Sequence, residues 1–152
     1  MSNNKKIAAN ARTLYLIKHI EFASGLRLDQ SLKEYQLTGG QYAALSILNR
    51  MDPLSSAELA RRLFTTPQST NEMVANLEKK RLIERHEDPD NRRILRINLT
   101  EEARQILKNC DDIVNELEAD FLRALDEEQL ETLRHLLELI LLDHRNRAAH
   151  NK

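Results

Sequence analysis

Apolar side chains recur every three to four positions along most of the chain, which is the spacing of one face of an α-helix. Capping residues mark where helices begin: Thr38 and Ser55 each stand three positions before a Gln or Glu, and Thr66 directly precedes Pro67. Prolines fall between the periodic segments, where they interrupt no helix. These signals predict helices over residues 6–35, 38–51, 55–63 and 66–81.

The pattern changes after Leu82. Residues 94–99 alternate between β-branched or leucine side chains and polar ones, and turn-forming residues occupy 88–91 just before them. This arrangement is typical of two antiparallel strands joined by a tight turn. It predicts a hairpin over 83–88 and 93–99, with a basic tip that is exposed to solvent.

Two long helices are predicted after the hairpin, over residues 101–123 and 126–147. Thr100 caps the first, whose apolar residues form one continuous stripe. The second carries leucines on more than one stripe between 130 and 142. So much leucine would leave an apolar face exposed on a monomer, and such faces usually mark interfaces. We therefore expect a homodimer; the alternative is that one protomer's own core covers the whole face.

Composition agrees with a mainly helical domain. The chain has 152 residues, of which 41% are apolar and 31% charged, with only 3 Gly, 3 Pro and 1 Cys. A chain of this length can bury a substantial core without a disulfide or a metal. The predicted fold class is mainly α with a small β-hairpin, in a single domain, 1–152.

Several function classes become less favourable. Scarce glycine leaves no place for the loops that bind nucleotide phosphates. The longest apolar run, 139–142, is too short to span a bilayer, and the first residues lack a signal-peptide core. We therefore expect a cytoplasmic protein without a membrane partner.

The middle of the chain has the plan of a helix-turn-helix. A short helix over 55–63, a tight connection and a second helix over 66–81 follow one another, and the hairpin behind them makes the winged version. If Thr70, Val74 and Leu77 face the core, the 100° rotation per residue directs a polar face outward.

That outward face has the chemistry of a DNA reader. Amides, hydroxyls and one carboxylate can read base edges in the major groove, Asn and Gln preferring adenine and a carboxylate preferring cytosine. Basic residues beyond this face (Lys79, Lys80, Arg81) and on the hairpin (Arg92, Arg93, Arg96) suit phosphates. The partner is therefore predicted to be double-stranded DNA. The predicted contact residues are Thr66, Gln68, Ser69, Thr70, Asn71, Glu72, Asn76, Lys79, Arg92 and Arg93.

Motifs through the middle of the chain resemble those of the MarR family. They are Ser56-Ala-Glu-Leu-Ala-Arg-Arg-Leu-Phe, Pro67-Gln-Ser-Thr, Leu77-Glu-Lys-Lys-Arg-Leu-Ile-Glu-Arg, Asp88-Pro-Asp-Asn-Arg-Arg and Leu99-Thr-Glu-Glu-Ala. The resemblance implies a bacterial or archaeal homodimeric transcriptional regulator of triangular shape. It also implies a winged helix-turn-helix lobe over 38–100 and intertwined dimerisation helices in 1–37 and 101–152.

The resemblance also assigns roles by position. The recognition helix would be 66–80, and the wing-tip arginine would be Arg92. Three positions depart from the family pattern: members often have arginine where Glu72 stands, glycine where Arg81 stands and aspartate where Asn91 stands. A carboxylate at the first position changes the expected operator, and a charged residue at the second is expected to alter the turn into the wing.

Members of this family typically release DNA when a small molecule, often an aromatic or phenolic anion, binds between the dimer helices and the DNA-binding lobe. A small-molecule effector is therefore implied here. The candidate ligand-binding residues are Tyr15, His19, Arg27 and Tyr42, each of which has the alternative reading of a partly buried side chain with its polar tip in water.

Three alternatives remain beside a ligand-responsive repressor. Redox sensing through Cys110 is one, although its place in an apolar stripe favours an inert thiol. A winged-helix domain used only for protein contacts is another. Catalysis is the third and least favoured, because no nucleophile motif appears. No metal or cofactor is expected, since the histidines (His19, His86, His135, His144 and His150) form no i, i+4 pair.

The formal net charge of -1 conceals an uneven distribution. Residues 1–54 carry a net +3, residues 55–100 a net +2 and residues 101–152 a net -6. Acidic side chains therefore concentrate away from the face expected to meet DNA. The modest positive charge of the lobe predicts weak non-specific affinity, with selectivity resting on the amide-rich face and the wing.

Overall fold

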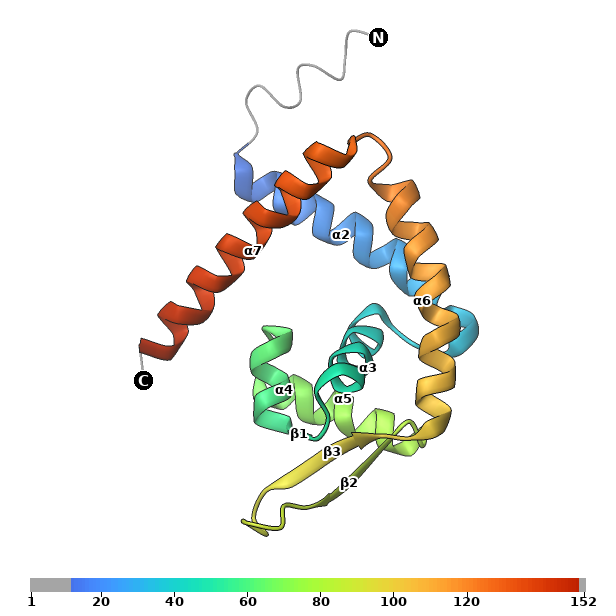
Figure 1. The fold of residues 1–152 in the computed structure, drawn as a ribbon, viewed down its shortest axis with the longest axis vertical. Coiled ribbons are helices and arrows are strands. Elements are labelled where there is room, and N and C mark those ends of the chain that lie inside the picture. Colours follow the sequence, from blue (N-terminus) through green and yellow to red (C-terminus); the bar gives the residue numbers. More distant parts are fainter. Residues whose placement is uncertain (1–11, 151–152) are drawn as a thin grey trace, which may run out of the picture.

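The computed structural model describes residues 12–150, with side chains to 147. Figure 1 shows the elements in chain order. They are α2 (Thr13–Ser31), the 3-10 helix η1 (Lys33–Tyr35), α3 (Gly39–Met51), β1 (Leu54–Ser55), α4 (Ser56–Leu63), α5 (Pro67–Lys79), β2 (Ile83–Glu87), β3 (Leu95–Leu99), α6 (Glu101–Phe121) and α7 (Glu127–His150). The mainly helical fold with a hairpin wing is confirmed.

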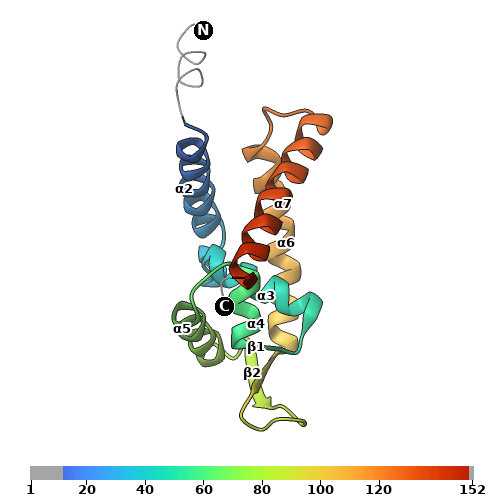
Figure 2. The same ribbon diagram turned by 90° about the vertical axis from the view of Figure 1, so that its left-hand side faces the viewer.

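The elements gather at two ends of the molecule. In Figures 1 and 2, α3, α4, α5 and the hairpin form a lobe at the lower end, while α2, α7 and the distal half of α6 form the upper end. The far end of α7 returns toward the lobe, where the Arg145 guanidinium lies 5.5 Å from the centre of the Phe64 ring. The hairpin points away from the terminal helices.

Side-chain caps begin the helices where the sequence places them. Thr38 and Ser55 each form a complete capping box, with Gln41 and Glu58 as the reciprocal partners. Thr66 accepts a bond from the Ser69 backbone N–H at the start of α5. These bonds satisfy amides of the first turn that have no partner within the helix.

The first long helix is shorter than predicted. Within the described residues α2 ends at Ser31, a 3-10 turn follows, and Gln36 takes a left-handed conformation with φ 54°. The chain bends here because Leu32 and Leu37 are both buried in the core, which a continuous helix through 35 would not allow. Residues 6–11 of the predicted helix lie outside the described range.

A two-residue strand, β1, is an addition to the predicted hairpin. The sheet is antiparallel in the order β1-β3-β2, with Leu54 opposite Ile97 and Ser55 opposite Arg96. A strand of two residues shows no alternation, so periodicity could not reveal it. The pairing attaches the wing to the start of α4.

The core lies within the lobe and continues along the lower part of α6. Its fully buried side chains include Leu45 from α3, Leu59 from α4, Leu77 from α5, Ile97 from β3 and Leu107 from α6. Burial of a leucine or isoleucine contributes about 1.5 to 3 kcal/mol, so these contacts dominate the stability of the lobe.

The terminal helices stay outside this core. Neither α2 nor α7, through residue 147, contains a buried side chain. Their large exposed apolar residues are Leu14, Tyr15, Leu16, Ile17, Ile20, Phe22 and Leu26 on α2, and Leu136, Leu137, Leu139, Ile140, Leu141 and Leu142 on α7. Within residues 12–150, no helix combines the length and the apolar character needed to cross a bilayer.

The turn from α5 into the wing keeps a left-handed residue despite the absence of glycine. Arg81 has φ 58°, its N–H donates to the Glu78 carbonyl, and the Leu82 N–H donates to the Leu77 carbonyl. Thr100 Oγ1 donates to the Arg81 carbonyl at 2.9 Å. The expectation that an arginine here would alter the turn is therefore wrong. The hydrogen bonds around Arg81 hold it in the left-handed conformation, in which its Cβ makes unfavourable steric contacts.

Replacement of Arg81 by glycine should stabilise the protein. Removing the Cβ relieves left-handed strain and should raise the free energy of unfolding by about 1 kcal/mol, or the melting temperature by about 2 to 4 °C. Urea and thermal denaturation measure this change. Arg81→Ala is the control, since it removes the charge but keeps the Cβ; equal stabilisation by both variants would refute the strain explanation.

Candidate nucleic-acid interface

The connection between α4 and α5 fixes the recognition helix. Phe64 closes α4 in a left-handed conformation with φ 53°, and the hydroxyls of Thr65 and Thr70 share a hydrogen bond of 2.7 Å. Thr70 has no exposed surface. This corrects its inclusion among the predicted DNA contacts: on the core face of α5, its side chain cannot reach a base or a phosphate.

The remaining predicted residues of α5 are exposed. Gln68, Glu72, Asn76 and Lys79 have no hydrogen bond or ion pair from their side chains to other residues of the described chain. Their amide, carboxylate and ammonium groups are therefore available to a ligand on this face. The sequence-based arrangement of the helix face agrees with the structure, while the DNA contacts themselves stay predictions.

Two further polar residues of this face are held by neighbours. Thr66 Oγ1 donates to Ser69 Oγ at 2.9 Å, which leaves the serine proton free to donate outward. Ser56 Oγ, in the first turn of α4, donates to Asn71 Oδ1 at 2.5 Å. The side chains of Ser69 and Asn71 are therefore oriented before any partner arrives.

Not every basic residue near α5 is free for phosphates. Lys80 Nζ donates to the Gln36 carbonyl at 2.5 Å and to Gln41 Oε1 at 3.1 Å. Arg85 of β2 forms an ion pair with Glu78 of α5. Lys80 therefore braces α5 against the start of α3, while its exposed ammonium keeps its charge and its role at phosphates stays a prediction.

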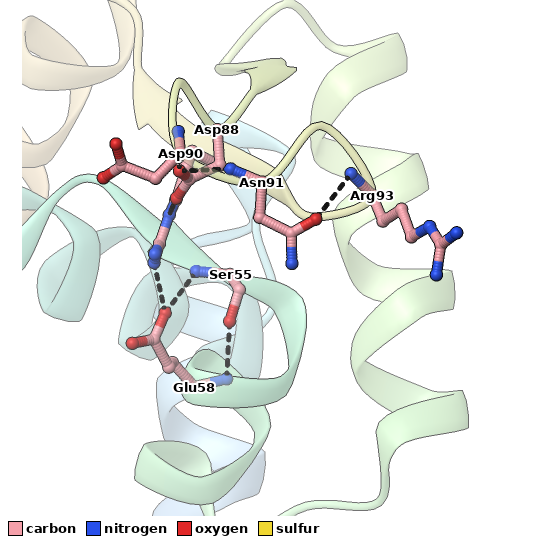
Figure 3. Close-up of polar contacts among 7 residues, drawn as sticks. Ser55, Glu58, Asp88, Asp90, Asn91 and Arg93 are labelled. Atoms are coloured by element: carbon pink, nitrogen blue, oxygen red, sulfur yellow. Dashed lines mark hydrogen bonds and ion pairs between the residues drawn. The ribbon is translucent and has the colours of Figure 1, made fainter.

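Asp88 organises the tip of the wing. Its Oδ1 accepts from the backbone N–H groups of Asp90 at 2.8 Å and Asn91 at 3.3 Å, as Figure 3 shows. Asn91 Oδ1 in turn accepts from the Arg93 N–H at 3.2 Å. An amide at position 91 thus supplies an acceptor that orders the wing, where the family often has aspartate.

Arg96 joins the wing to the helix-turn-helix. Its Nε lies 2.5 Å from Asp88 Oδ2, and its Nη1 lies 2.7 Å from Glu58 Oε2. Glu58 also accepts from the Ser55 backbone N–H at 2.7 Å (Figure 3), and this bond is the largest cause of its lowered pKa. Arg96 therefore neutralises two protein carboxylates, which corrects its suggested role at phosphates.

The wing tip presents two arginines to solvent. Arg92 is 88% exposed and lies 3.9 Å from Glu87, the limit of an ion pair, so the pairing constrains it little. Arg93 is exposed and is fixed only through its backbone N–H. Both are exposed cations of the kind that suits a nucleic-acid backbone or a narrow minor groove, and their contacts with DNA stay predictions.

The four candidate ligand-binding residues do not form one site in the protomer. The rings of Tyr15 and His19 lie against each other on α2, with centres 4.2 Å apart and planes tilted by 50°. Arg27 pairs with Asp120 of α6 at 2.6 Å. The Tyr42 hydroxyl donates to Asp111 at 2.7 Å, and burial together with this bond raises the pKa of Tyr42 to about 12. Arg27 and Tyr42 are thus already bound to protein carboxylates.

Cys110 and the histidines were the remaining candidates for redox or metal chemistry. Cys110 is fully buried, and desolvation raises the pKa of its thiol to about 11, so little reactive thiolate exists near neutral pH. No group of three or more metal-binding side chains occurs among the described residues. His150 lies beyond the described side chains.

The fold and this polar face define a winged helix-turn-helix protein, and comparisons with known proteins place it more closely. Residues 35–94 match the model of the MarR family. The HTH-type transcriptional regulator YhbI of Bacillus subtilis is 30% identical over 109 residues, covering 72% of this chain and 71% of YhbI. The chain belongs to the MarR family of transcriptional regulators, which are not enzymes.

Solved structures agree with this assignment. Staphylococcus aureus MepR, in a crystal structure of its DNA complex, is 26% identical with a TM-score of 0.79, covering 88% of this chain and 99% of MepR. BpsR of Bordetella bronchiseptica, whose DNA binding is regulated by 6-hydroxynicotinic acid, has a TM-score of 0.81 at 15% identity, covering 87% of this chain and 94% of BpsR. The latter likeness supports the fold alone.

Local sequence patterns do not reveal the residues that fix the positions of the wing, α4 and α5 relative to one another. In the sequence Asp88, Glu58 and Ser56 have the character of turn, capping and motif residues, and their partners lie up to 38 positions away. An acidic residue beside Pro89 was the available signal for the wing turn, because such residues commonly bond nearby backbone amides.

The Asp88 network should make stability depend on pH. The bond from Arg96, followed by the Asp90 backbone bond, holds the pKa of Asp88 below its usual value. Its stabilising effect is therefore present above about pH 4 and is lost as pH falls through the lowered pKa. We expect the difference in unfolding free energy between wild type and Asp88→Asn, measured in urea, to be largest near pH 6 and to shrink toward pH 3.

Asp90→Asn is the matched control for this measurement. It removes a neighbouring carboxylate whose side chain accepts none of these bonds, so its unfolding free energy should differ little from wild type at either pH. The electrostatic explanation would be contradicted if the difference in unfolding free energy between wild type and Asp88→Asn stayed constant from pH 6 to pH 3.

Proposed function

We propose that the protein is a sequence-specific DNA-binding regulator that acts in the cytoplasm as a homodimer on a pseudo-palindromic operator. The main support is the exposed polar face of α5 beside a wing that carries two unpaired or weakly paired arginines. A major groove admits a helix of this kind, and a wing beside it can reach the adjoining backbone or minor groove. The DNA-bound structure of MepR supports the same assignment.

The residues divide into readers and anchors. Gln68, Ser69, Asn71, Glu72 and Asn76 would contact base edges, because they carry the amide, hydroxyl and carboxylate groups that distinguish base pairs. Thr66 caps the helix at the groove. Anchoring would come from Lys79, Arg92 and Arg93, whose cationic groups are free or nearly free in the protomer.

Dimer formation is inferred from the exposed apolar faces of α2 and α7. Among the side chains of these helices that the structure describes, thirteen large apolar ones are more than a third exposed. Contact with a second copy would remove this surface from water, at about 25 cal/mol per Å² buried. The proposal therefore gives 38–100 to DNA and the helices in 1–37 and 101–152 to the dimer, within one domain of 1–152.

We also propose a repressor that is released by a small aromatic or phenolic anion. Arg27 supports this, since a ligand carboxylate or phenolate could compete with Asp120 for its guanidinium. Tyr15, His19 and Tyr42 stay the accompanying candidates. The regulation of BpsR by 6-hydroxynicotinic acid offers a first probe. If this acid and related compounds leave both melting temperature and DNA affinity unchanged, the class of effector is wrong.

DNA binding should depend steeply on salt. Three anchoring cations per protomer give about six phosphate contacts per dimer, so affinity for DNA upstream of the gene should fall about 10³-fold between 50 and 200 mM salt. Fluorescence anisotropy measures this slope. Arg92→Ala should weaken all sequences and reduce the slope, while Gln68→Ala should cost about 1 to 3 kcal/mol only at particular base pairs.

Two results would contradict this assignment. Affinity that is absent or insensitive to salt would remove the case for a DNA-binding regulator. A uniform loss for Gln68→Ala across all sequences would remove its role as a base reader and place it among the anchors.

A charge in the apolar face of α7 should separate the protomers. Leu139→Glu places a carboxylate where the dimer requires apolar contact, so sedimentation should show a shift toward the monomer and operator affinity should fall at least tenfold. Met51→Glu, at a similarly exposed apolar position in the lobe, is the control and should stay dimeric. A wild-type protein that sediments as a monomer would refute the dimer.

A further inference from the structure

The contact between Ser56 and Asn71 joins the two helices of the helix-turn-helix at the exposed face. Asn71 stands on the outward side of α5, while Ser56 is the first residue of α4. The Ser56 hydroxyl donates to Asn71 Oδ1 at 2.5 Å. The amide oxygen of Asn71 is therefore directed toward α4 rather than toward the surface that would meet DNA.

The orientation of the amide decides which hydrogen bonds it can offer. An asparagine amide is planar and carries an acceptor oxygen and a donor NH₂ group on opposite branches. Because Ser56 holds the amide oxygen of Asn71, the NH₂ group is the branch of the amide that faces outward. No acceptor in the described chain bonds to that nitrogen, so both of its protons remain available.

The start of α4 favours this orientation over the reverse. A serine hydroxyl could also accept from the NH₂ group, but Ser56 lies at the helix N-terminus, where unpaired backbone amides create a positive potential. That potential attracts the amide oxygen and repels the NH₂ group. The donation from Ser56 and the helix dipole therefore act in the same direction.

The frame around this contact is rigid. Ser55 and Glu58 complete the capping box that starts α4, and Arg96 ties Glu58 to the wing. The bond between Thr65 and Thr70 fixes the turn between the helices. Rotation of the Asn71 amide would therefore exchange this bond for one in which Ser56 accepts from the NH₂ group, which the positive potential at the start of α4 disfavours.

Adenine and guanine present different hydrogen-bonding groups to an asparagine. Adenine presents an acceptor, N7, and a donor, the N6 amino group, so bidentate reading needs both the oxygen and the NH₂ group of the amide. Guanine presents only acceptors, N7 and O6, along the same edge. An amide that offers donors alone is complementary to guanine and leaves the adenine amino group unpaired.

We propose that Ser56 is a specificity-determining residue that orients the Asn71 amide to read guanine instead of adenine. Ser56 acts through Asn71 and contacts no base itself. The inference rests on the proposed DNA-binding function and deepens it, since it changes the adenine preference expected for an asparagine in a recognition helix into a preference for an acceptor edge.

The test is selection of bound duplexes from a randomised DNA pool with the full-length protein, followed by sequencing. Asn71→Ala identifies the position that Asn71 reads, as the one where preference disappears. Wild type should prefer guanine over adenine there by about 5- to 150-fold, the range for a good bidentate contact. Ser56→Ala frees the amide, so guanine and adenine should come within about threefold of each other.

A second variant reverses the polarity of the contact. In Ser56→Asp a carboxylate can only accept, so it should bind the Asn71 NH₂ group and turn the amide oxygen outward. Preference should then move from guanine toward bases with an exposed amino group, adenine or cytosine. Ser24→Ala is the control: it removes a serine hydroxyl that donates to the Glu21 carbonyl within α2, outside the helix-turn-helix, so it should leave the base preference of wild type.

The outcomes separate this inference from the proposed function. A wild-type preference for adenine at the Asn71 position, or an unchanged guanine preference in Ser56→Ala, overturns the inference and leaves the DNA-binding function intact. A uniform loss for Asn71→Ala at all positions makes Asn71 a phosphate contact and also overturns it. A wild-type protein that enriches no sequence at all overturns the proposed function, and the inference with it.

Discussion

The guanidinium of Arg96 is the constraint on which the interface depends. It bonds to Asp88 at the wing turn and to Glu58 in the first turn of α4, so one side chain joins the hairpin to the helix-turn-helix. Paired charges tolerate partial burial only when several hydrogen bonds satisfy them, and here the backbone N–H groups of Ser55, Asp90 and Asn91 complete the set. The wing therefore has a fixed direction relative to α5.

The same hydrogen-bond network continues from the wing to the exposed polar face of α5. Glu58 caps α4, and α4 supplies Ser56, which orients Asn71. A displacement of the wing would therefore disturb α4 and with it the amide on α5. Polar groups of this interface are arranged in advance, which lowers the entropy lost when a partner binds.

Local signals predicted the elements well because their causes are local. The capping boxes at Thr38 and Ser55 and the proline after Thr66 act within one helical turn, and each helix begins where they indicate. The burial of Thr70 also follows from helical periodicity, which placed it toward the core even though it was included among the contacts. Local patterns therefore predict structural features, such as helix starts and helix faces, whose interacting residues lie three or four positions apart.

Features that depend on distant partners could not be predicted in this way. Arg96 was read as a phosphate contact because a hairpin arginine has the same local sequence whether it faces solvent or a carboxylate 38 residues away. The bonds of Lys80 are equally hidden from the local sequence, since its acceptors are Gln36, just after η1, and Gln41 of α3. The ion pairs of Arg96 set its charge against two protein carboxylates, whereas the bonded Lys80 stays exposed.

This loss of free cations changes how the lobe would select DNA. Nine basic side chains lie between residues 55 and 100, but Arg85 and Arg96 are paired with protein carboxylates. Phosphate attraction acts on every sequence alike, so fewer free cations lower non-specific affinity without weakening base readout. The paired cations meanwhile hold α5 and the wing in place. The paired basic residues therefore lower non-specific affinity for DNA and also fix the positions of the side chains that would contact bases.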